Sequence, residues 1–222
     1  MNSKRIAFIV DNALRDLAGL VLVAHALTRQ GVACYLVPGE AKNEELMSLR
    51  PDMVVVFNLR KSLNQFFKNL LDTGMAVVLL DVEGGVWPSM ADYTELLTTD
   101  RSVLDRITRV CLWGKRMQPF LRENNYFSDS QMRVTGCPRF DVYNKKFRGL
   151  IQTNGAGGRP RILINTNTAE LNQRNTTREE VRAFYVNRYG WSKDRIDTHF
   201  QTQETAYLLT LDMIRQLVRD FP

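Results

Sequence analysis

The feature that most constrains this 222-residue chain is a regular alternation of short apolar runs with segments of helical spacing. The runs are apolar at successive positions and rich in β-branched residues, which is typical of strands buried on both faces. We predict strands at Lys4–Asp11, Val32–Pro38, Asp52–Asn58, Met75–Glu83, Arg109–Gly114 and Met132–Gly136. We predict the intervening helices at Leu14–Gln30, Asn43–Leu49, Leu63–Asp72, Asp92–Thr98, Ser102–Ile107 and Met117–Asn124. The alternation predicts an α/β fold, a Rossmann-like doubly wound parallel sheet with helices on both faces.

The pattern divides the chain into three parts. Residues 1–148 form the predicted Rossmann-like domain, and residues 149–160, dense in Gly, Asn and Thr, form a predicted linker. Beyond it we predict a strand at Arg161–Asn165 and helices at Arg178–Tyr189 and Thr202–Arg219. One strand and two helices cannot cover a sheet of their own, so we expect 161–222 to be the beginning of a second Rossmann-like domain.

Composition restricts the class of protein. The chain is 44% hydrophobic and 24% charged, which is typical of a globular protein. Its three cysteines form no CxxC pair and it has only two histidines, which indicates free thiols in a reducing cytoplasm and no transition-metal site. Residues 101–148 carry 11 basic and 4 acidic side chains, a block that would attract phosphates, nucleic acid or an anionic membrane surface.

Polar residues gather where the predicted strands end, which is where open parallel sheets bind ligands. Asp81 and Glu83 share a side by strand alternation, and the glycines after them would let backbone approach a ligand closely. Trp87 would either stack on a sugar ring or pack in the core. The residues expected at this edge are Asp11, Asn12, Arg15, Asn58, Asp81, Glu83, Gly84, Gly85, Trp87 and Gly114. In the second domain, Asn165 and Asn167 follow the predicted strand and would face the same cleft.

The segment Val134–Asp141 is more specific. Gly136 permits a tight turn, and Arg139 offers a guanidinium fork for carboxylate or phosphate. Asp141 is then presented at a fixed distance from the strand end. Alternatively, Arg139 and Asp141 pair with each other or with a helix end.

Several common catalytic motifs are missing from the sequence. The first strand is not followed by GxGxxG, and neither GxxxxGK[ST] nor GxSxG occurs, which disfavours a dinucleotide dehydrogenase, a P-loop enzyme and an α/β-hydrolase. Both histidines lie far from any nucleophile in the sequence, so we interpret them as structural.

Five segments together resemble the bacterial surface carbohydrate biosynthesis proteins. They are IAFIVDNALRDLAGLVLVAHAL, FNLRK, LLDVEGGVW, CLWGKRMQPFL and VTGCPRFDVY, and the resemblance covers roughly residues 4–170. These proteins are GT-B glycosyltransferases, similar to the retaining transferases of 3-deoxy-D-manno-oct-2-ulosonic acid (Kdo) in capsule and lipopolysaccharide assembly.

The resemblance implies a function and a partition of roles. The N-terminal domain would hold a glycan or glycolipid acceptor, and the C-terminal domain a nucleotide-sugar donor, CMP-Kdo, with no other cofactor. Retention by double displacement needs two carboxylates. The matching positions are Asp141 as nucleophile and Glu83 as general acid/base, with Arg139 as an anion clamp. The Arg-Pro-His-Pro-like donor segment of such enzymes does not occur before Pro222, so 161–222 is expected to be a truncated donor-binding domain.

Three alternatives remain open at this stage. A sugar-nucleotide 2-epimerase or polyol-phosphate transferase of the same architecture would bind uridine or cytidine diphosphate and would need no carboxylate nucleophile. A non-catalytic module would bind glycan or a partner enzyme without using Glu83. Nucleic-acid binding rests only on the basic block, whose residues are better suited to peripheral contact with the inner membrane.

Overall fold

The computed structural model describes residues 3–87, 89–150, 163–166, 168–171, 173 and 175–221. The chain divides into two compact units, Met1–Asn154 and Gly155–Pro222, and each is described by itself. Within the described residues, no helix is both long enough and apolar enough to cross a membrane.

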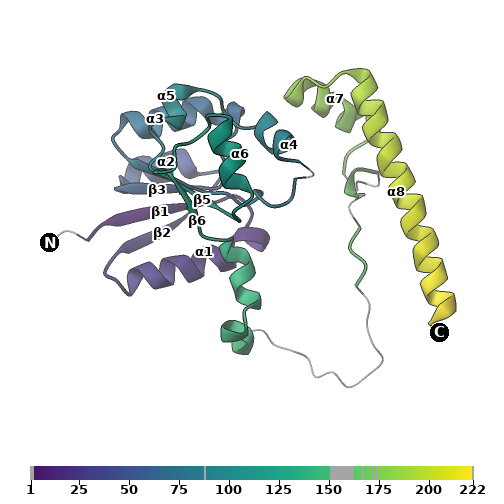
Figure 1. Cartoon of the computed structure of the whole chain (residues 1–222), viewed down its shortest axis with the longest axis horizontal. Helices are drawn as coiled ribbons and strands as arrows, with labels where there is room; N and C mark the ends of the chain where they lie inside the picture. The colour runs from purple at the N-terminus through teal and green to yellow at the C-terminus, as the bar shows by residue number, and fades with distance from the viewer. Residues whose placement is uncertain are drawn as a thin grey trace. The chain divides into compact units, whose positions relative to one another are not determined.

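The first unit is built on one parallel sheet of six strands in the order β2-β1-β3-β4-β5-β6 (Figure 1). The strands are β1 (Arg5–Val10), β2 (Ala33–Pro38), β3 (Met53–Val56), β4 (Ala76–Leu80), β5 (Arg109–Leu112) and β6 (Met132–Val134). Ala7, Phe8 and Ile9 are successive residues of β1 and all are buried, as a strand covered on both faces requires. The predicted Rossmann-like α/β fold with a parallel sheet is confirmed.

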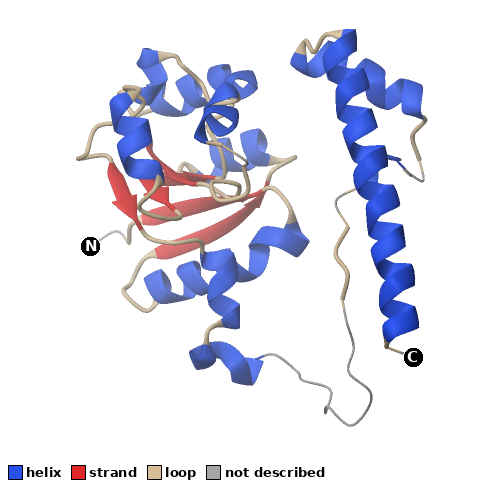
Figure 2. Cartoon of the chain, turned by 45° about the vertical axis from the view of Figure 1, so that its right-hand side comes forward, coloured by secondary structure: helices blue, strands red, loops and turns tan. Residues whose placement is uncertain are grey.

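Helices cover both faces of this sheet (Figure 2). They are α1 (Ala13–Thr28), α2 (Lys42–Leu49), α3 (Asn64–Asp72), α4 (Met90–Glu95), α5 (Arg101–Leu104) and α6 (Met117–Glu123), with 3-10 turns η1 (Lys61–Leu63), η2 (Pro138–Tyr143) and η3 (Lys145–Leu150). Leu46 of α2, Leu70 of α3 and Leu121 of α6 share the larger core cluster. Leu20 of α1 joins Phe8, Val55 and Leu80 in a smaller cluster on the opposite face.

The strands end earlier than their apolar runs predict. Strand β4 ends at Leu80, β5 at Leu112 and β6 at Val134, so the polar residues that follow lie in turns and not in the ladder. Asp81 therefore does not alternate with Glu83 as a strand residue would. Asp81 is buried, whereas Glu83 is partly exposed.

The second unit is a helical pair. Helix α7 (Arg178–Tyr189) matches its prediction, begins with a Thr177–Glu180 capping box and ends at Gly190 in the left-handed conformation. Helix α8 (Lys193–Asp220) begins nine residues before the predicted Thr202. Its true start is Ser192, whose hydroxyl caps the backbone N–H of Arg195, a local signal that the apolar spacing alone does not carry.

The packing of this pair is local. Val181 and Tyr185 of α7 pack on Ile196 and Phe200 of α8, and Trp191 stacks on Tyr185 with ring centroids 4.4 Å apart. The predicted strand at Arg161–Asn165 is wrong where the structure describes it, because Leu163–Thr166 form no strand. No described segment pairs with this stretch, and a strand without a partner leaves its backbone groups unsatisfied.

Candidate functional site

The candidate site lies where the order of the strands reverses. The chain moves from β1 to β2 in one direction and from β3 to β6 in the other, so β1 and β3 are neighbours at the switch point. Open α/β sheets bind ligands in the crevice beyond the carboxyl ends of such strands. The segments that leave the sheet there are Asp11–Asn12 after β1, Phe57–Arg60 after β3 and Asp81–Glu83 after β4.

Glu83 lies between two arginines that come from different segments. Arg15 of α1 donates from Nη1 to Glu83 Oε1 at 3.3 Å, and Arg60 donates from Nη2 to Oε2. The three side chains are each a little over one quarter exposed, so they are within reach of solvent and of a ligand. Arg60 belongs to the FNLRK segment, but the strand-end pattern did not single it out.

Arg15 is the centre of this charge network. Its Nη2 lies 2.7 Å from Asp11 Oδ2, and its Nε lies 2.7 Å from Oδ1 of the buried Asp16. The hydrogen bond to Asp16 is the largest cause that raises the pKa of Arg15, which therefore stays charged. Asn12 has a structural role here, because its Oδ1 accepts from the backbone N–H of Arg15 and caps α1.

Asp81 is buried beneath Glu83. It accepts a hydrogen bond from the Tyr93 hydroxyl, and its Oδ1 accepts from the Glu83 backbone N–H at 2.7 Å. Burial is the largest cause that raises the pKa of Asp81. The expectation that Asp81 binds substrate is not supported by this placement. Its contacts hold the turn that presents Glu83.

Side chains from the protein interior occupy the space beside the two glycines of the DVEGG turn. A Cβ added at Gly85 would lie 2.5 Å from Cζ3 of Trp113, and one added at Gly84 would lie 3.0 Å from the methyl carbon of Met117. Trp113 Nε1 also donates to the Asp81 carbonyl at 2.6 Å. Gly85 therefore makes room for the Trp113 ring and Gly84 for the end of Met117, which is a different reason for their presence from the expected approach of a ligand.

Other predicted residues of this edge take less direct positions. Trp87 is partly buried against the larger core cluster, which favours the interpretation as a core aromatic over a sugar platform. Asn58 Oδ1 accepts from the backbone N–H of Arg60 at 3.2 Å and shapes the turn that carries this arginine. Gly114 has open space around it.

The Gly136–Asp141 segment packs on α1 through its backbone. Gly136 has a φ of 83°, the left-handed conformation expected of the turn. A Cβ added at Gly19 would lie 2.5 Å from the backbone nitrogen of Arg139, so glycine is needed at this point of α1. Gly19 is four residues after Arg15. The residue that binds Glu83 and the residue that packs on this segment are therefore one helical turn apart on α1.

The two charged residues of the segment do not pair with each other. The guanidinium of Arg139 lies over the rings of Trp113 and Phe140, 4.9 Å and 4.8 Å from their centroids. Its Nε is buried and has no hydrogen-bond partner among the described residues. Asp141 is exposed on η2, and within the described chain its carboxylate forms no ion pair. A cavity of about 20 Å³, enough for one water, is lined by Asp16, Asp81, Cys137 and Arg139 among others.

The second-unit residues cannot be added to this site. Asn165 is exposed in its own unit, and Asn167 lies outside the described residues. The predicted residues that the first unit does bring together are Asp11, Arg15, Asp81 and Glu83, with Arg139 reached through Trp113.

Sequence reasoning missed four residues that organise the site. Arg60 binds Glu83, Asp16 binds Arg15, Tyr93 binds Asp81, and Trp113 joins the DVEGG turn to Arg139. Asp16 and Trp113 were inside the segments that carry the family resemblance. Tyr93 had no local signal, because its hydroxyl meets Asp81 only after β4 and α4 have packed.

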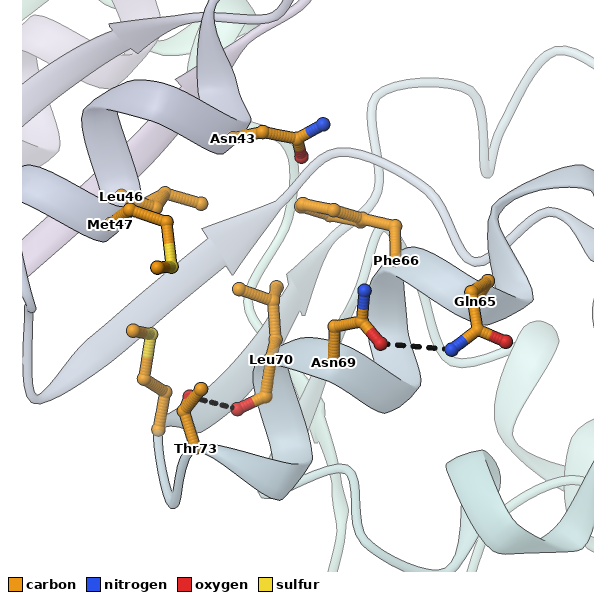
Figure 3. Close-up of a pocket in the computed structure, with 9 residues that line it drawn as sticks. Asn43, Leu46, Met47, Gln65, Phe66, Asn69, Leu70 and Thr73 are labelled. Atoms are coloured by element: carbon orange, nitrogen blue, oxygen red, sulfur yellow. Dashed lines mark hydrogen bonds between the residues drawn. The ribbon is translucent and has the colours of Figure 1, made fainter.

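Two cavities larger than the one at the switch point lie beside α2 and α3. One, of about 450 Å³, is lined by Leu46, Met47, Phe66, Leu70 and Met75 among others, between α2 and α3 (Figure 3). The second, of about 460 Å³, continues it past Arg50 and Gly74. Figure 3 shows polar side chains in the first cavity bonded to their own helix, as Gln65 is to Asn69. The first cavity has no charged lining residue, and we take it as a weaker candidate than the switch point.

The site has no features of metal or thiol chemistry in the described ranges. No group of three or more His, Cys, Asp or Glu side chains there is arranged to hold a metal ion. The three cysteines are free, and burial raises the pKa of each thiol, including that of Cys137 beside the site. The chemistry available here is that of carboxylates and guanidiniums.

Comparison with known proteins adds no name to this geometry. No protein-family model matches the chain, and a search of curated proteins finds no significant match. A functional proposal therefore rests on the sequence resemblance and on the residues of the switch point.

Proposed function

We propose that this chain is a GT-B glycosyltransferase of bacterial surface polysaccharide assembly, with its first unit as the acceptor-side domain. The activated donor is a CMP-linked ulosonic acid such as CMP-Kdo, and the acceptor is a glycan or glycolipid. The protein works in the cytoplasm, at the inner face of the membrane that carries the acceptor. The family resemblance in the sequence is the origin of this proposal, and the geometry of the switch point supports it.

One observation carries most of the weight. Arg15 and Gly19, one turn apart on α1, support the two segments that hold the proposed catalytic carboxylates. Arg15 binds Glu83, and Gly19 allows close packing of the backbone segment that leads to Asp141. A double displacement needs two carboxylates organised around one reacting carbon. Helix α1 contacts both segments that carry them, so one helix would hold both in position.

The proposed chemistry has two steps. An Asp141 oxygen bonds to the anomeric carbon while the bond from that carbon to the CMP phosphate oxygen breaks, and the electron pair leaves with CMP. An acceptor hydroxyl then attacks the same carbon, the bond to Asp141 breaks, and Glu83 takes the hydroxyl proton. The net configuration at the carbon is retained because it is inverted twice.

The arginines have a defined part in this proposal. Both oxygens of Glu83 accept from guanidiniums in the structure, so one contact must open before Glu83 can reach an acceptor hydroxyl. An anionic group of the substrate, a carboxylate or phosphate, is the natural competitor for Arg15 or Arg60. Arg139, with its buried Nε lacking a partner in the described chain, is the proposed third anion contact.

The test is transfer from CMP-Kdo to a Kdo-accepting glycolipid by the protein and by three variants. We expect Asp141→Asn to abolish transfer and Glu83→Gln to lower it by about 10²–10⁴-fold, the usual contribution of general acid–base catalysis. Asp129→Asn is the matched control, an exposed carboxylate of the same unit that pairs with Arg122. Normal turnover by Asp141→Asn would contradict the proposal.

The pairing of Glu83 with two arginines also favours a second candidate, a non-catalytic module that binds glycan or a partner enzyme. A carboxylate held by two arginines is a common structural ion network. This candidate predicts that Glu83→Gln leaves cellular polysaccharide assembly intact. Loss of assembly by a folded Glu83→Gln protein would reject it.

A further inference from the structure

Helix α1 has an outward face without a fixed charge. Between Ala13 and Thr28 the only Asp, Glu, Lys or Arg residues are Arg15 and Asp16, and both belong to the ion network of the site. Leu14, Leu17, Ala18 and Val21 follow helical spacing and form one exposed stripe, with Leu14 102% and Val21 44% exposed.

This stripe is not the side of α1 that packs on the sheet. The sheet side buries Asp16, Gly19 and Leu20, and Leu20 is part of the smaller core cluster. A surface helix of a globular protein normally turns polar and charged residues outward. Helix α1 is apolar on both sides, and an uncovered apolar helix face of this kind marks an interaction surface.

Two segments that contact α1 also carry exposed apolar residues. On β2, the edge strand of the sheet, Leu36 is 40% exposed, on the same face as Cys34, which packs in the α1-side cluster. On the other side, η2 packs against α1 and carries Tyr143, which is 73% exposed.

Unpaired positive charge follows directly along the chain. Lys145 and Lys146 of η3 are exposed, and neither has an acidic partner in the part of the chain that the structure describes. Residues 101–148 as a whole carry 11 basic and 4 acidic side chains. Within η2 and η3 the exposed acid is Asp141.

We propose that this surface, the α1 face, docks on an anionic lipid bilayer. We define the α1 face as Leu14, Leu17, Ala18, Val21 and Tyr143, together with Lys145 and Lys146, which follow Tyr143 closely in the sequence. An uncharged apolar stripe accompanied by exposed lysines fits the boundary between acyl chains and anionic headgroups. A second copy of the chain fits less well, because it would bring the same unpaired lysines to the contact.

The proposal deepens the proposed function, on which it rests for the choice of a glycolipid-bearing membrane as partner. It gives α1 a second role, since the same helix supports Glu83 through Arg15. Docking through the α1 face would hold the switch point beside the bilayer surface. Membrane binding needs no sugar transfer, so the two proposals fail in different experiments.

The test is co-flotation of the full chain with vesicles of phosphatidylcholine containing 30% phosphatidylglycerol, and with phosphatidylcholine alone. We expect binding to the anionic vesicles that weakens with salt. Leu14→Glu/Val21→Glu should lower the partition coefficient about a hundredfold, because each leucine- or valine-sized side chain loses roughly a decade of apolar transfer. Lys145→Glu/Lys146→Glu should lower it about fivefold for each lysine.

Met47→Glu is the matched control, because Met47 is 68% exposed but lies on α2, which packs on the opposite face of the sheet from α1. Circular dichroism of each variant verifies that it is folded. Three outcomes would overturn the proposal: no flotation of the unaltered chain, equal losses for Met47→Glu and the α1 variant, or a dimer in light scattering that Leu14→Glu/Val21→Glu dissociates while flotation is unchanged.

Discussion

At the scale of single residues, the DVEGG turn is held from inside by one aromatic ring. Trp113 fills the space beside Gly85, bonds the Asp81 carbonyl and lies beneath the Arg139 guanidinium. Asp81 in turn accepts from the backbone N–H of Glu83 and from Tyr93. The position of Glu83 therefore depends on residues that never need to touch a ligand.

This dependence can be measured with Gly85→Ala. The new methyl group would overlap the Trp113 ring, and overpacking of this kind costs about 1–3 kcal/mol in the free energy of unfolding. Gly114→Ala is the control, because nothing lies within 4 Å of the Cβ position there. Urea unfolding measures the stability of both variants. A Gly85→Ala protein as stable as Gly114→Ala would contradict the packing of Trp113 against Gly85.

The residue scale is also where sequence reasoning was least complete. Asp11, Arg15 and Glu83 could be placed at the switch point because strand ends of a parallel sheet meet at one edge. The role of Asp81 could not, because strand alternation fails once β4 ends at Leu80. Arg60 and Tyr93 reach their partners only through tertiary packing, which no local pattern encodes.

At the scale of elements, α1 joins the separate parts of the site. Its first turn is capped by Asn12 and carries Arg15, and its second turn meets the Pro138–Arg139 backbone at Gly19. Most elements could be predicted, because buried parallel strands and amphipathic helices leave strong apolar patterns. Two features could not be predicted. The start of α8 at Lys193 depends on the Ser192 cap, and a strand at Leu163–Asn165 would need a partner strand.

We predict that Gly19→Ala separates η2 from α1. Alanine favours a helix interior by up to about 1 kcal/mol over glycine, but here its Cβ would meet backbone atoms that cannot rotate away. The clash should outweigh the helical gain and release the segment that carries Arg139. Hydrogen exchange should become faster at residues 137–143 while that of β1 and β3 is unchanged.

Ala18→Ser is the control for this experiment, since Ala18 is the exposed neighbour of Gly19 on the same helix. A Gly19→Ala protein that is more stable than the unaltered chain, with unchanged exchange at 137–143, would contradict the close packing of α1 on η2.

At the scale of the whole molecule, each unit has a core of its own. The two core clusters of the first unit contain only residues before Asn154, and the cluster of the second contains residues of α7 and α8 with Leu171 and Trp191. The domain boundary expected near residue 148 and the division after Asn154 differ by a few residues. The function of the chain stays a proposal, because an α/β sheet of this kind supports many chemistries.

Independent cores predict that a fragment of residues 1–154 folds by itself. We expect one cooperative urea transition with a helical circular-dichroism spectrum, because its buried strands keep every covering helix. A fragment of residues 1–127 is the contrast, since it lacks β6 and uncovers the edge of β5. An unfolded 1–154 fragment would mean that the first unit depends on residues beyond Asn154.

The shared position of the Trp113 ring has a mechanical consequence. One rigid indole contacts the DVEGG turn through Gly85 and the Asp81 carbonyl, and the Arg139 loop through its face. A ligand that drew the Arg139 guanidinium away would uncover that face of the ring. Because the same ring also packs beside Gly85, anion binding at Arg139 would be expected to change the packing around the turn that carries Glu83.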